Sequence, residues 1–161
     1  QNIGGSVDSY IKEDVVEEYK YLKKSFEKRL DHSESNKVYM AVGQTYNNSN
    51  GFLLASQNGG ATWSKYEMPC IIGGNSGARN VGERLTIDPI TPTTLYFGGR
   101  NGVLYQSLDS GVTWKEKHTF TGCESANGTN VGIAMVMVEP KTSDVIVGTY
   151  AKTNPIYRSN N

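Results

Sequence analysis

The N-terminal part of the chain contains the clearest helical pattern. Six apolar side chains recur there at intervals of three and four residues and form one stripe: Ile11, Val15, Tyr19, Leu22, Phe26 and Leu30. Residues 8–37 also hold 15 of the 32 charged side chains (16 basic plus 16 acidic), with acidic residues in the first half and basic residues in the last turns, as suits the helix macrodipole. The pattern predicts an amphipathic α-helix, which either lies against the body of the protein or uses its stripe for self-association.

The remainder of the chain is typical of short strands joined by tight turns. Its apolar runs are short, the longest being Ile133 to Val138, and Gly, Asn, Ser and Thr interrupt them every few positions. We therefore expect residues 1–35, with a degenerate Ile-Gly-Gly element and the charged helix, to precede a β domain of residues 36–161. The predicted fold class is mainly β.

One eight-residue motif occurs twice in this β domain. Residues Ser56 to Trp63 and Ser107 to Trp114 match at a displacement of 51 positions, and Ser159 begins a third copy displaced by a further 52. Matching strands precede the copies: Lys37 to Gly43, Thr94 to Gly99, Asp144 to Gly148, Leu85 to Pro89 and Val136 to Pro140. A unit of about 50 residues with several short strands and a hairpin is the size of one propeller blade. The repeat predicts about three β-propeller-type blades.

The motif has the composition of a hairpin staple. Its serine and the Asn or Asp two residues later can accept hydrogen bonds from nearby backbone N–H groups. Its glycine permits a positive φ, and its tryptophan returns to strand and covers the edge of the blade. This is the Asp-box, and we interpret its residues as structural rather than ligand-binding: Ser56, Asn58, Gly60, Trp63, Ser107, Asp109, Gly111 and Trp114.

Composition and charge argue against several classes of partner. The formal net charge is zero, so no long-range field would attract a nucleic acid backbone or an anionic membrane. No segment approaches the roughly 18 consecutive apolar residues of a membrane span. The two cysteines and two histidines show no ligand spacing, which predicts no metal site, and we expect no cofactor.

Four segments between the motifs resemble a known enzyme family. They are Tyr39 to Gly43, Gly73 to Pro89 with its Gly-Glu-Arg-Leu sequence, Leu95 to Arg100 and Lys152 to Ser159. They resemble the xyloglucan-cleaving glycoside hydrolases of family 74 over about residues 36–161. The resemblance implies two seven-bladed propellers facing each other across a cleft, and inverting hydrolysis of a xylose-branched β-1,4-glucan by two carboxyl groups.

One catalytic position departs from the family pattern. The family's two catalytic Asp residues each precede an Ile-Gly-Gly sequence, whereas here Asn2 precedes Ile3-Gly4-Gly5. An amide does not ionise and cannot act as a general base. Asn2, Asn58, Asp109 and Asn161 share one phase of the repeat, which predicts three repeats, fewer than the four to eight blades of a typical propeller. We therefore expect a fragment or a degenerate relative that is inactive alone.

The segment most like the family, with two tyrosines, supplies the candidate sugar contacts. The candidate substrate-binding residues are Asn75, Arg79, Glu83, Arg84, Tyr46 and Tyr150. A planar polar side chain beside an aromatic face suits a pyranose ring. Each residue also has a structural explanation, since Glu83 and Arg84 can form a buried ion pair that fixes the loop.

The remaining features bear on secretion. Cys70 and Cys123 lie in similar loops of neighbouring repeats, and we predict a disulfide between them, with two buried thiols as the alternative. Asn47 and Asn127 fit the N-glycosylation pattern, which agrees with a secreted glycoprotein. A mature chain that starts at Gln1 would be consistent with removal of a signal peptide.

Three functions are open at this point. The first is a fragment or degenerate relative of a secreted xyloglucan hydrolase. The second is a non-catalytic glycan-binding propeller module. In both, the partner is xyloglucan or a related β-glucan of the plant cell wall. The third is a self-assembling structural protein, a homo-oligomer that pairs its open blade edges and the helix.

Overall fold

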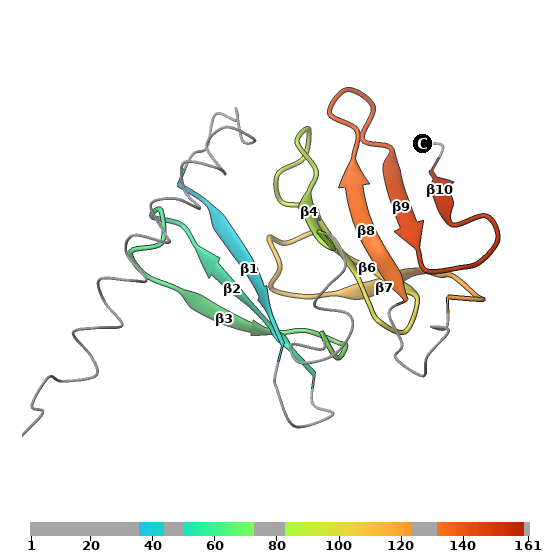
Figure 1. Cartoon of the computed structure of the whole chain (residues 1–161). Coiled ribbons are helices and arrows are strands. Elements are labelled where there is room, and N and C mark those ends of the chain that lie inside the picture. The colour runs from blue at the N-terminus through green and yellow to red at the C-terminus, as the bar shows by residue number, and fades with distance from the viewer. Residues whose placement is uncertain (1–35, 44–49, 73–82, 124–131, 160–161) are drawn as a thin grey trace, which may run out of the picture. The chain divides into compact units, whose positions relative to one another are not determined.

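The described structure is confined to part of the chain. The computed structural model describes residues 36–43, 50–72, 83–123 and 132–159 (Figure 1). The chain divides into two units, residues 1–35 and 36–161. The predicted N-terminal helix belongs to the first unit and lies outside the described residues. Within the described ranges the chain forms strands and turns and no helix.

The described residues form ten short strands. They are β1 (Val38–Val42), β2 (Phe52–Ser56), β3 (Ser64–Glu67), β4 (Leu85–Ile87), β5 (Leu95–Gly98), β6 (Val103–Ser107), β7 (Lys115–Thr119), β8 (Ile133–Val138), β9 (Val145–Thr149) and β10 (Ile156–Arg158). Sequential strands pair antiparallel into a first sheet (β1-β2-β3), a second sheet (β4-β5-β6-β7) and a third sheet (β8-β9-β10). The prediction of a mainly β chain is confirmed.

The sequence repeat is also a structural repeat. Each motif serine lies opposite the start of an equivalent strand: Ser56 opposite Val38, Ser107 opposite Leu95, and Ser159 opposite Val145. Strands β1, β5 and β9 are therefore equivalent, as are β2, β6 and β10. In the same way β3 matches β7, and β8 matches β4. Positions in one sheet can thus be compared directly with positions in the next.

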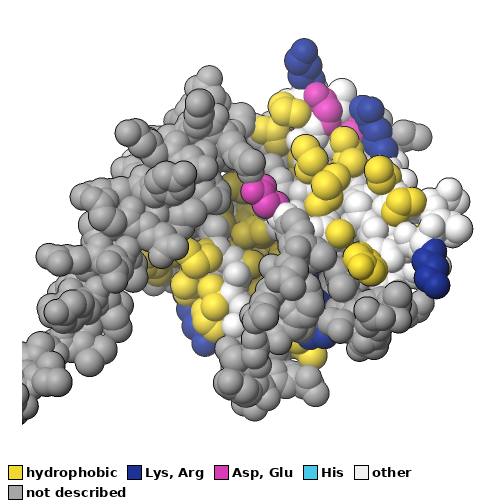
Figure 2. Space-filling view, viewed as in Figure 1, with side chains coloured by type: hydrophobic (Ala, Val, Ile, Leu, Met, Phe, Trp, Pro, Cys, Tyr) yellow, Lys and Arg dark blue, Asp and Glu magenta, His cyan; other side chains and the backbone are white. Residues whose placement is uncertain are grey.

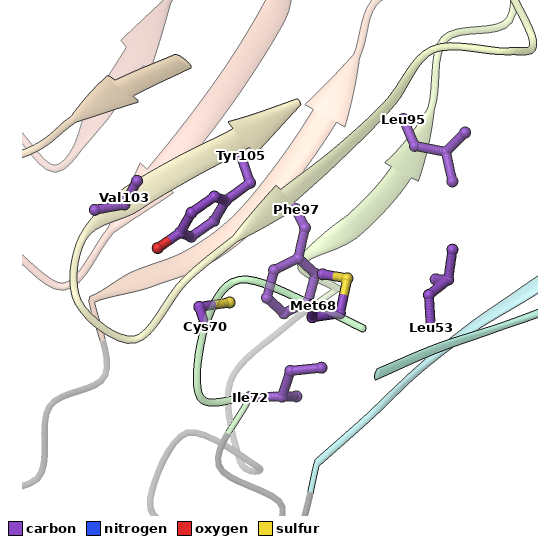
Figure 3. Packing of buried hydrophobic residues seen from close by; sticks show 8 residues of the cluster. All are labelled: Leu53, Met68, Cys70, Ile72, Leu95, Phe97, Val103 and Tyr105. Carbon is purple, nitrogen blue, oxygen red and sulfur yellow. The ribbon is translucent and has the colours of Figure 1, made fainter. Parts of the chain in front are cut away.

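The first and second sheets pack through one buried cluster (Figure 3). Its residues are Leu53, Met68, Cys70 and Ile72 from β2 and the end of the first sheet, and Leu95, Phe97, Val103 and Tyr105 from β5 and β6. Figure 3 shows these side chains pointing into the space between the two sheets. Burying an aliphatic or aromatic side chain of this size stabilises the fold by about 1.5–3 kcal/mol. This cluster therefore holds the two sheets together.

The opposite face of the second sheet packs on the third sheet. This second cluster contains Tyr96, Leu104, Phe120, Cys123, Ile133, Val136, Val145 and Val147. Successive residues of a strand point to opposite faces, so β5 contributes Leu95 and Phe97 to one cluster and Tyr96 to the other. All four residues of β5 are accordingly buried. The second sheet is covered on both faces.

The predicted disulfide is wrong. Cys70 and Cys123 are buried thiols that belong to different clusters, on opposite faces of the second sheet. The N–H groups of Met68 and Phe120 make equivalent hydrogen bonds at 2.9 Å. Cys70 lies in the first cluster with Met68, and Cys123 lies in the second cluster with Phe120. Each thiol is therefore buried between its own sheet and the next one, and the second sheet separates the two. Burial raises the pKa of the Cys70 thiol to about 12, which leaves it unreactive at neutral pH.

Candidate functional site

The antiparallel order gives the sheets two ends with different chemistry. At the end that we call the motif end lie the hairpins that follow Ser56 and Ser107, and the turns that join β4 to β5 and β8 to β9. At the other end, which we call the loop end, the described strands border the ranges 44–49, 73–82 and 124–131. The predicted structural motifs and the strand ends that flank the predicted sugar contacts are thus separated.

The first motif closes its own hairpin. Ser56 Oγ donates to Asn58 Oδ1 at 2.9 Å and accepts from Gly60 N at 2.8 Å. Asn58 Oδ1 also accepts from Thr62 N at 2.9 Å. Trp63, which ends the motif, is 37% exposed. All of these hydrogen bonds lie within the motif, so the side chains of Ser56 and Asn58 fix its turn.

The second motif repeats the same geometry with a carboxylate. Ser107 Oγ donates to Asp109 Oδ1 at 2.8 Å, and Asp109 Oδ1 accepts from Thr113 N at 2.8 Å. The Thr113 hydroxyl and backbone N–H hold the pKa of the Asp109 carboxyl below its usual value. Trp114 Nε1 donates to Gly111 O at 3.0 Å, and the indole packs against the first cluster. Here too the motif residues act on their own hairpin.

The other acidic residues of the motif end also hold turns. Asp88 Oδ1 accepts from two backbone N–H groups of its turn at 2.9 and 3.3 Å, and Glu139 Oε2 does so at 2.9 and 2.7 Å. Asp88 further accepts from Ser143 Oγ at 2.8 Å. Asp144 Oδ2 pairs with the guanidinium of Arg158 at 2.6 Å. These carboxylates serve turn structure and strand pairing.

Hydrogen bonds connect the loop ends of the three sheets. They join Ile72 O to Arg84 Nη2 (3.0 Å), Glu83 O to Val136 N (2.9 Å), Gly99 O to Ile133 N (3.1 Å) and Gly132 O to Tyr150 N (2.9 Å). Three of the predicted sugar-contact residues, Glu83, Arg84 and Tyr150, lie at this end. Backbone hydrogen bonds thus fix the position of Glu83 just before β4 and that of Tyr150 just after β9.

Arg84 is directed into the protein. Its guanidinium donates to Ile72 O at 3.0 Å and to Gly98 O at 3.5 Å, and lies 5.4 Å from the ring centroid of Phe97. Burial is the main reason that the pKa of Arg84 is lowered. Arg84 therefore ties the segment after β3 to the end of β5. Glu83 is exposed, so the buried ion pair considered for these two residues is not formed.

Of the two tyrosines predicted to contact sugar, Tyr150 lies within the described residues, at the loop end. It follows β9 directly, and its side chain is 48% exposed. Its backbone N–H donates to Gly132 O at 2.9 Å, which holds the residue beside the start of β8. An exposed ring on a fixed backbone can stack on a flat ligand face.

The other candidates lie outside the described residues. These are the substituted catalytic position Asn2, the sugar-contact candidates Tyr46, Asn75 and Arg79, and the glycosylation sites Asn47 and Asn127. Of the six predicted sugar contacts, Glu83, Arg84 and Tyr150 lie at the loop end, with the Arg84 guanidinium directed into the protein, and all six stay predictions.

The sugar-contact residues predicted from the sequence do not include the turn between β5 and β6. This turn holds Arg100 and Asn101 at the loop end, where Asn101 is exposed and its Nδ2 donates to Tyr105 OH at 3.1 Å. Gly132 has a φ of +63°, and a Cβ at that position would collide with the backbone of Arg100. The dipeptide Asn101-Gly102 is a strong hairpin signal that would have located the turn from sequence.

Neither a metal centre nor a membrane-spanning helix is found in the described part of the chain. Among the described residues, no three His, Cys, Asp or Glu side chains are grouped so that they could hold a metal ion. The same residues include no helix of the length and apolar character needed to cross a bilayer.

Comparison with curated proteins finds xyloglucanases. The chain is 44% identical to a xyloglucanase of Hypocrea jecorina over 96 residues, which are 57% of this chain and 12% of that protein. It is 37% identical to a xyloglucanase of Paenibacillus sp. over 149 residues, covering 80% of this chain and 14% of that protein. A probable oligoxyloglucan-reducing end-specific xyloglucanase of Neosartorya fischeri is 34% identical over 117 residues, or 73% of this chain and 14% of that protein. No protein-family model matches the chain.

Comparison with solved structures agrees. The family 74 xyloglucanase of Xanthomonas campestris matches with a TM-score of 0.71 and 26% identity, over 80% of this chain and 21% of that one. A family 74 enzyme of Niastella koreensis matches with a TM-score of 0.68 and 27% identity, over 80% of this chain and 20% of that one. The chain thus spans 12–14% of the curated relatives named above and about a fifth of these solved structures.

Proposed function

Because the chain is a partial match to the family 74 xyloglucanases, we propose that it is a fragment or degenerate relative of a xyloglucan-hydrolysing β-propeller enzyme. The observation that carries this proposal is the agreement of sequence and fold, each of which covers 80% of the chain. In this proposal the three sheets are propeller blades, and the two motifs, with their matching hydrogen bonds, are Asp-boxes.

The chain alone does not cleave xyloglucan in this proposal. Inverting hydrolysis needs one carboxyl group to protonate the leaving oxygen and a second to activate water. Asn2 stands at the first of the family's catalytic positions and supplies an amide. Of the described carboxylates, those of the motif end are already engaged in turns and strand pairing. At the loop end, the exposed carboxylate of Glu83 does not match the family's catalytic positions, because no Ile-Gly-Gly sequence follows it.

The loop end is the proposed sugar-binding surface. Tyr150 offers an exposed ring there, and the Arg100 to Gly102 turn offers polar groups beside it. Arg84 supports this surface from inside, because it joins the chain on either side of residues 73–82 to β5. The proposed ligand is xyloglucan or a related β-glucan. We further propose that the protein is secreted, in keeping with the glycosylation patterns at Asn47 and Asn127.

Activity is tested directly on the substrate. The purified chain incubated with xyloglucan should release no reducing sugar above the rate of a boiled sample. A measurable rate would refute the proposed inactivity. Sequencing the gene beyond Gln1 and Asn161 tests the fragment proposal: an Ile-Gly-Gly element preceded by Asp in the flanking sequence supports it, and flanks without one favour a degenerate relative.

Binding is tested by calorimetric titration with xyloglucan oligosaccharides. Tyr150→Ala should weaken binding by roughly tenfold, since truncating an aromatic anchor typically costs more than 1 kcal/mol. Trp63→Ala, which removes an exposed ring at the motif end, should leave the affinity unchanged. The absence of heat with the wild-type chain at millimolar ligand, or equal losses in the two variants, would remove the loop end as a glycan-binding surface. Binding without cleavage would favour the alternative of a non-catalytic glycan-binding module.

A further inference from the structure

The turn between β9 and β10 carries Tyr150 at its start. Residues 152–155 of this turn are exposed. Figure 2, in the same view as Figure 1, shows this part of the molecule at the surface. Ordering a mobile side chain during binding costs affinity. An exposed ring is therefore an efficient contact only where the backbone beside it is already held.

The buried side chain of Thr149 closes this turn. Thr149 is the last residue of β9 and is 7% exposed. Its hydroxyl group donates a hydrogen bond to Pro155 O at 3.2 Å and accepts one from Ala151 N at 3.4 Å. Its backbone N–H also donates to Pro155 O, at 2.7 Å. One side chain thus joins the residue that follows Tyr150 to the far end of the turn.

The two peptide groups that flank the Cα of Tyr150 are both held. The N–H of Tyr150 itself donates to Gly132 O at 2.9 Å, at the start of β8. The next N–H along the chain is that of Ala151, which the Thr149 hydroxyl accepts. Because a residue turns only about its φ and ψ bonds, holding the peptide groups on either side restricts the direction of its side chain. The Thr149 hydroxyl therefore contributes to the orientation of the Tyr150 ring.

The equivalent turn of the second sheet is shorter and is closed by its backbone. There the N–H of Gly99 donates to Val103 O at 2.8 Å, which corresponds to the bond from Thr149 N to Pro155 O. Within this second-sheet turn, Gly102 N donates to Gly99 O at 3.2 Å. The third-sheet turn is two residues longer, and a threonine takes the place of Gly99. The hydroxyl is thus a feature of the turn that carries the exposed tyrosine.

We propose that Thr149 is a positioning residue for glycan binding, whose hydroxyl holds the Tyr150 ring in the orientation that stacks on a sugar. This inference rests on the proposed role of the loop end as a sugar-binding surface. Thr149 is buried, so it acts through Tyr150 and makes no contact with the sugar. Its contribution is preorganisation, because a ring that is already ordered loses less conformational freedom on binding.

Substitutions at Thr149 separate the hydroxyl from the packing of the side chain. Thr149→Val keeps the β-branched shape and removes the hydroxyl, whereas Thr149→Ser keeps the hydroxyl and removes the methyl group. In calorimetric titration with xyloglucan oligosaccharides, Thr149→Val should bind about threefold to tenfold more weakly than the wild-type chain, the cost of ordering one side chain. Thr149→Ser should bind like the wild-type chain. Equal losses in the two variants, or wild-type affinity in Thr149→Val, would overturn the proposal.

A matched control and a substitute variant accompany this comparison. Thr94→Val replaces a threonine that is 6% exposed and precedes β5 at the motif end, and its affinity should equal that of the wild-type chain. A loss in Thr94→Val as large as that in Thr149→Val would show a general effect of replacing a buried threonine and would count against the proposal. If Thr149→Val does not fold, Thr149→Ala removes the same hydroxyl and carries the same expectation.

A double-mutant cycle tests whether Thr149 acts through Tyr150. In the Tyr150→Ala background, Thr149→Val should cause no further loss of affinity, because the ring that the hydroxyl positions is absent. Losses that add in free energy would show that Thr149 affects binding by another route, and the proposal would fail.

Amide hydrogen exchange measured by NMR tests the positioning without any glycan. The amide of Ala151 should exchange faster in Thr149→Val than in the wild-type chain and at the wild-type rate in Thr149→Ser, while amides of β5 stay unchanged. An unchanged rate at Ala151 in Thr149→Val would overturn the positioning role. Absence of heat with the wild-type chain would instead refute the proposed glycan binding, so the two failures are distinguishable.

Discussion

Two equivalent tyrosines differ in whether their hydroxyl groups are satisfied, and this predicts opposite effects of one substitution. In the second sheet, Tyr96 OH accepts a hydrogen bond from Gln106 Nε2 at 2.9 Å. In the first sheet, Tyr39 occupies the equivalent position, but its partner across the strands is Ala55. Among the described residues, Tyr39 OH is the buried side-chain polar atom for which no hydrogen-bond partner is found.

The magnitudes follow from the cost of an unmade hydrogen bond. An unsatisfied buried hydroxyl costs about 1–3 kcal/mol, and a satisfied one contributes about 1 kcal/mol net. We expect Tyr39→Phe to stabilise the fold by about 0.5–1 kcal/mol, because it removes the desolvated hydroxyl and keeps the ring. Tyr96→Phe should destabilise it by about 1 kcal/mol, because it removes the acceptor of the Gln106 amide.

Equilibrium unfolding in urea measures both effects. Tryptophan fluorescence is a suitable signal, since Trp114 packs against the first cluster. For a typical urea dependence of about 2 kcal/mol per molar, the two variants should differ in midpoint by about 0.75–1 M, with unchanged slopes. If Tyr39→Phe is as destabilising as Tyr96→Phe, the Tyr39 hydroxyl has a partner in solution and the reasoning is refuted.

Two further predictions concern the motif-end hairpin of the second sheet and its surroundings. Gly111→Ala should destabilise the fold by roughly 1–3 kcal/mol more than Gly122→Ala, because both glycines have a positive φ (+87° and +74°) but only a Cβ at Gly111 would meet the Leu53 side chain. Equal costs in urea unfolding would contradict this. The lowered pKa of Asp109 stabilises the fold above its unfolded pKa of about 4, and this contribution is lost as the pH falls through the folded pKa. Asp109→Asn reproduces the Asn58 of the first motif. In this variant the urea midpoint should fall less between pH 6 and pH 2 than it does in the wild-type chain. An equal fall in both would show that Asp109 does not contribute to the pH dependence of stability.

The fold was readable from sequence where its cause is local. The period of about 50 residues, the Ser-x-Asp/Asn turns and the acidic-Pro turns all act within a few residues of themselves. The structure accordingly has the predicted strands and gives both complete motifs the same hydrogen bonds. The resemblance carried by Gly73 to Pro89 and its neighbours pointed to the family in which the comparisons then found relatives.

Contacts between sheets were not readable in the same way. Arg84 looked like a surface contact for sugar, yet its guanidinium donates to the carbonyls of Ile72 and Gly98. Cys70 and Cys123 occupy similar loops of neighbouring repeats, yet each packs between its own sheet and the next, so the two thiols lie on opposite faces of the second sheet. In both cases the outcome depended on which face of the second sheet a side chain meets.

The sequence by itself therefore determined the repeat, the turn chemistry and the mainly β class, because each depends on neighbours along the chain. Only the tertiary structure decided that Arg84 supports the loop end from inside, that Tyr39 is left without a partner while Tyr96 has one, and that the cysteines lie apart. The physical reason is that alternation along a strand assigns a residue to one of two faces, whereas packing between sheets decides what that face meets.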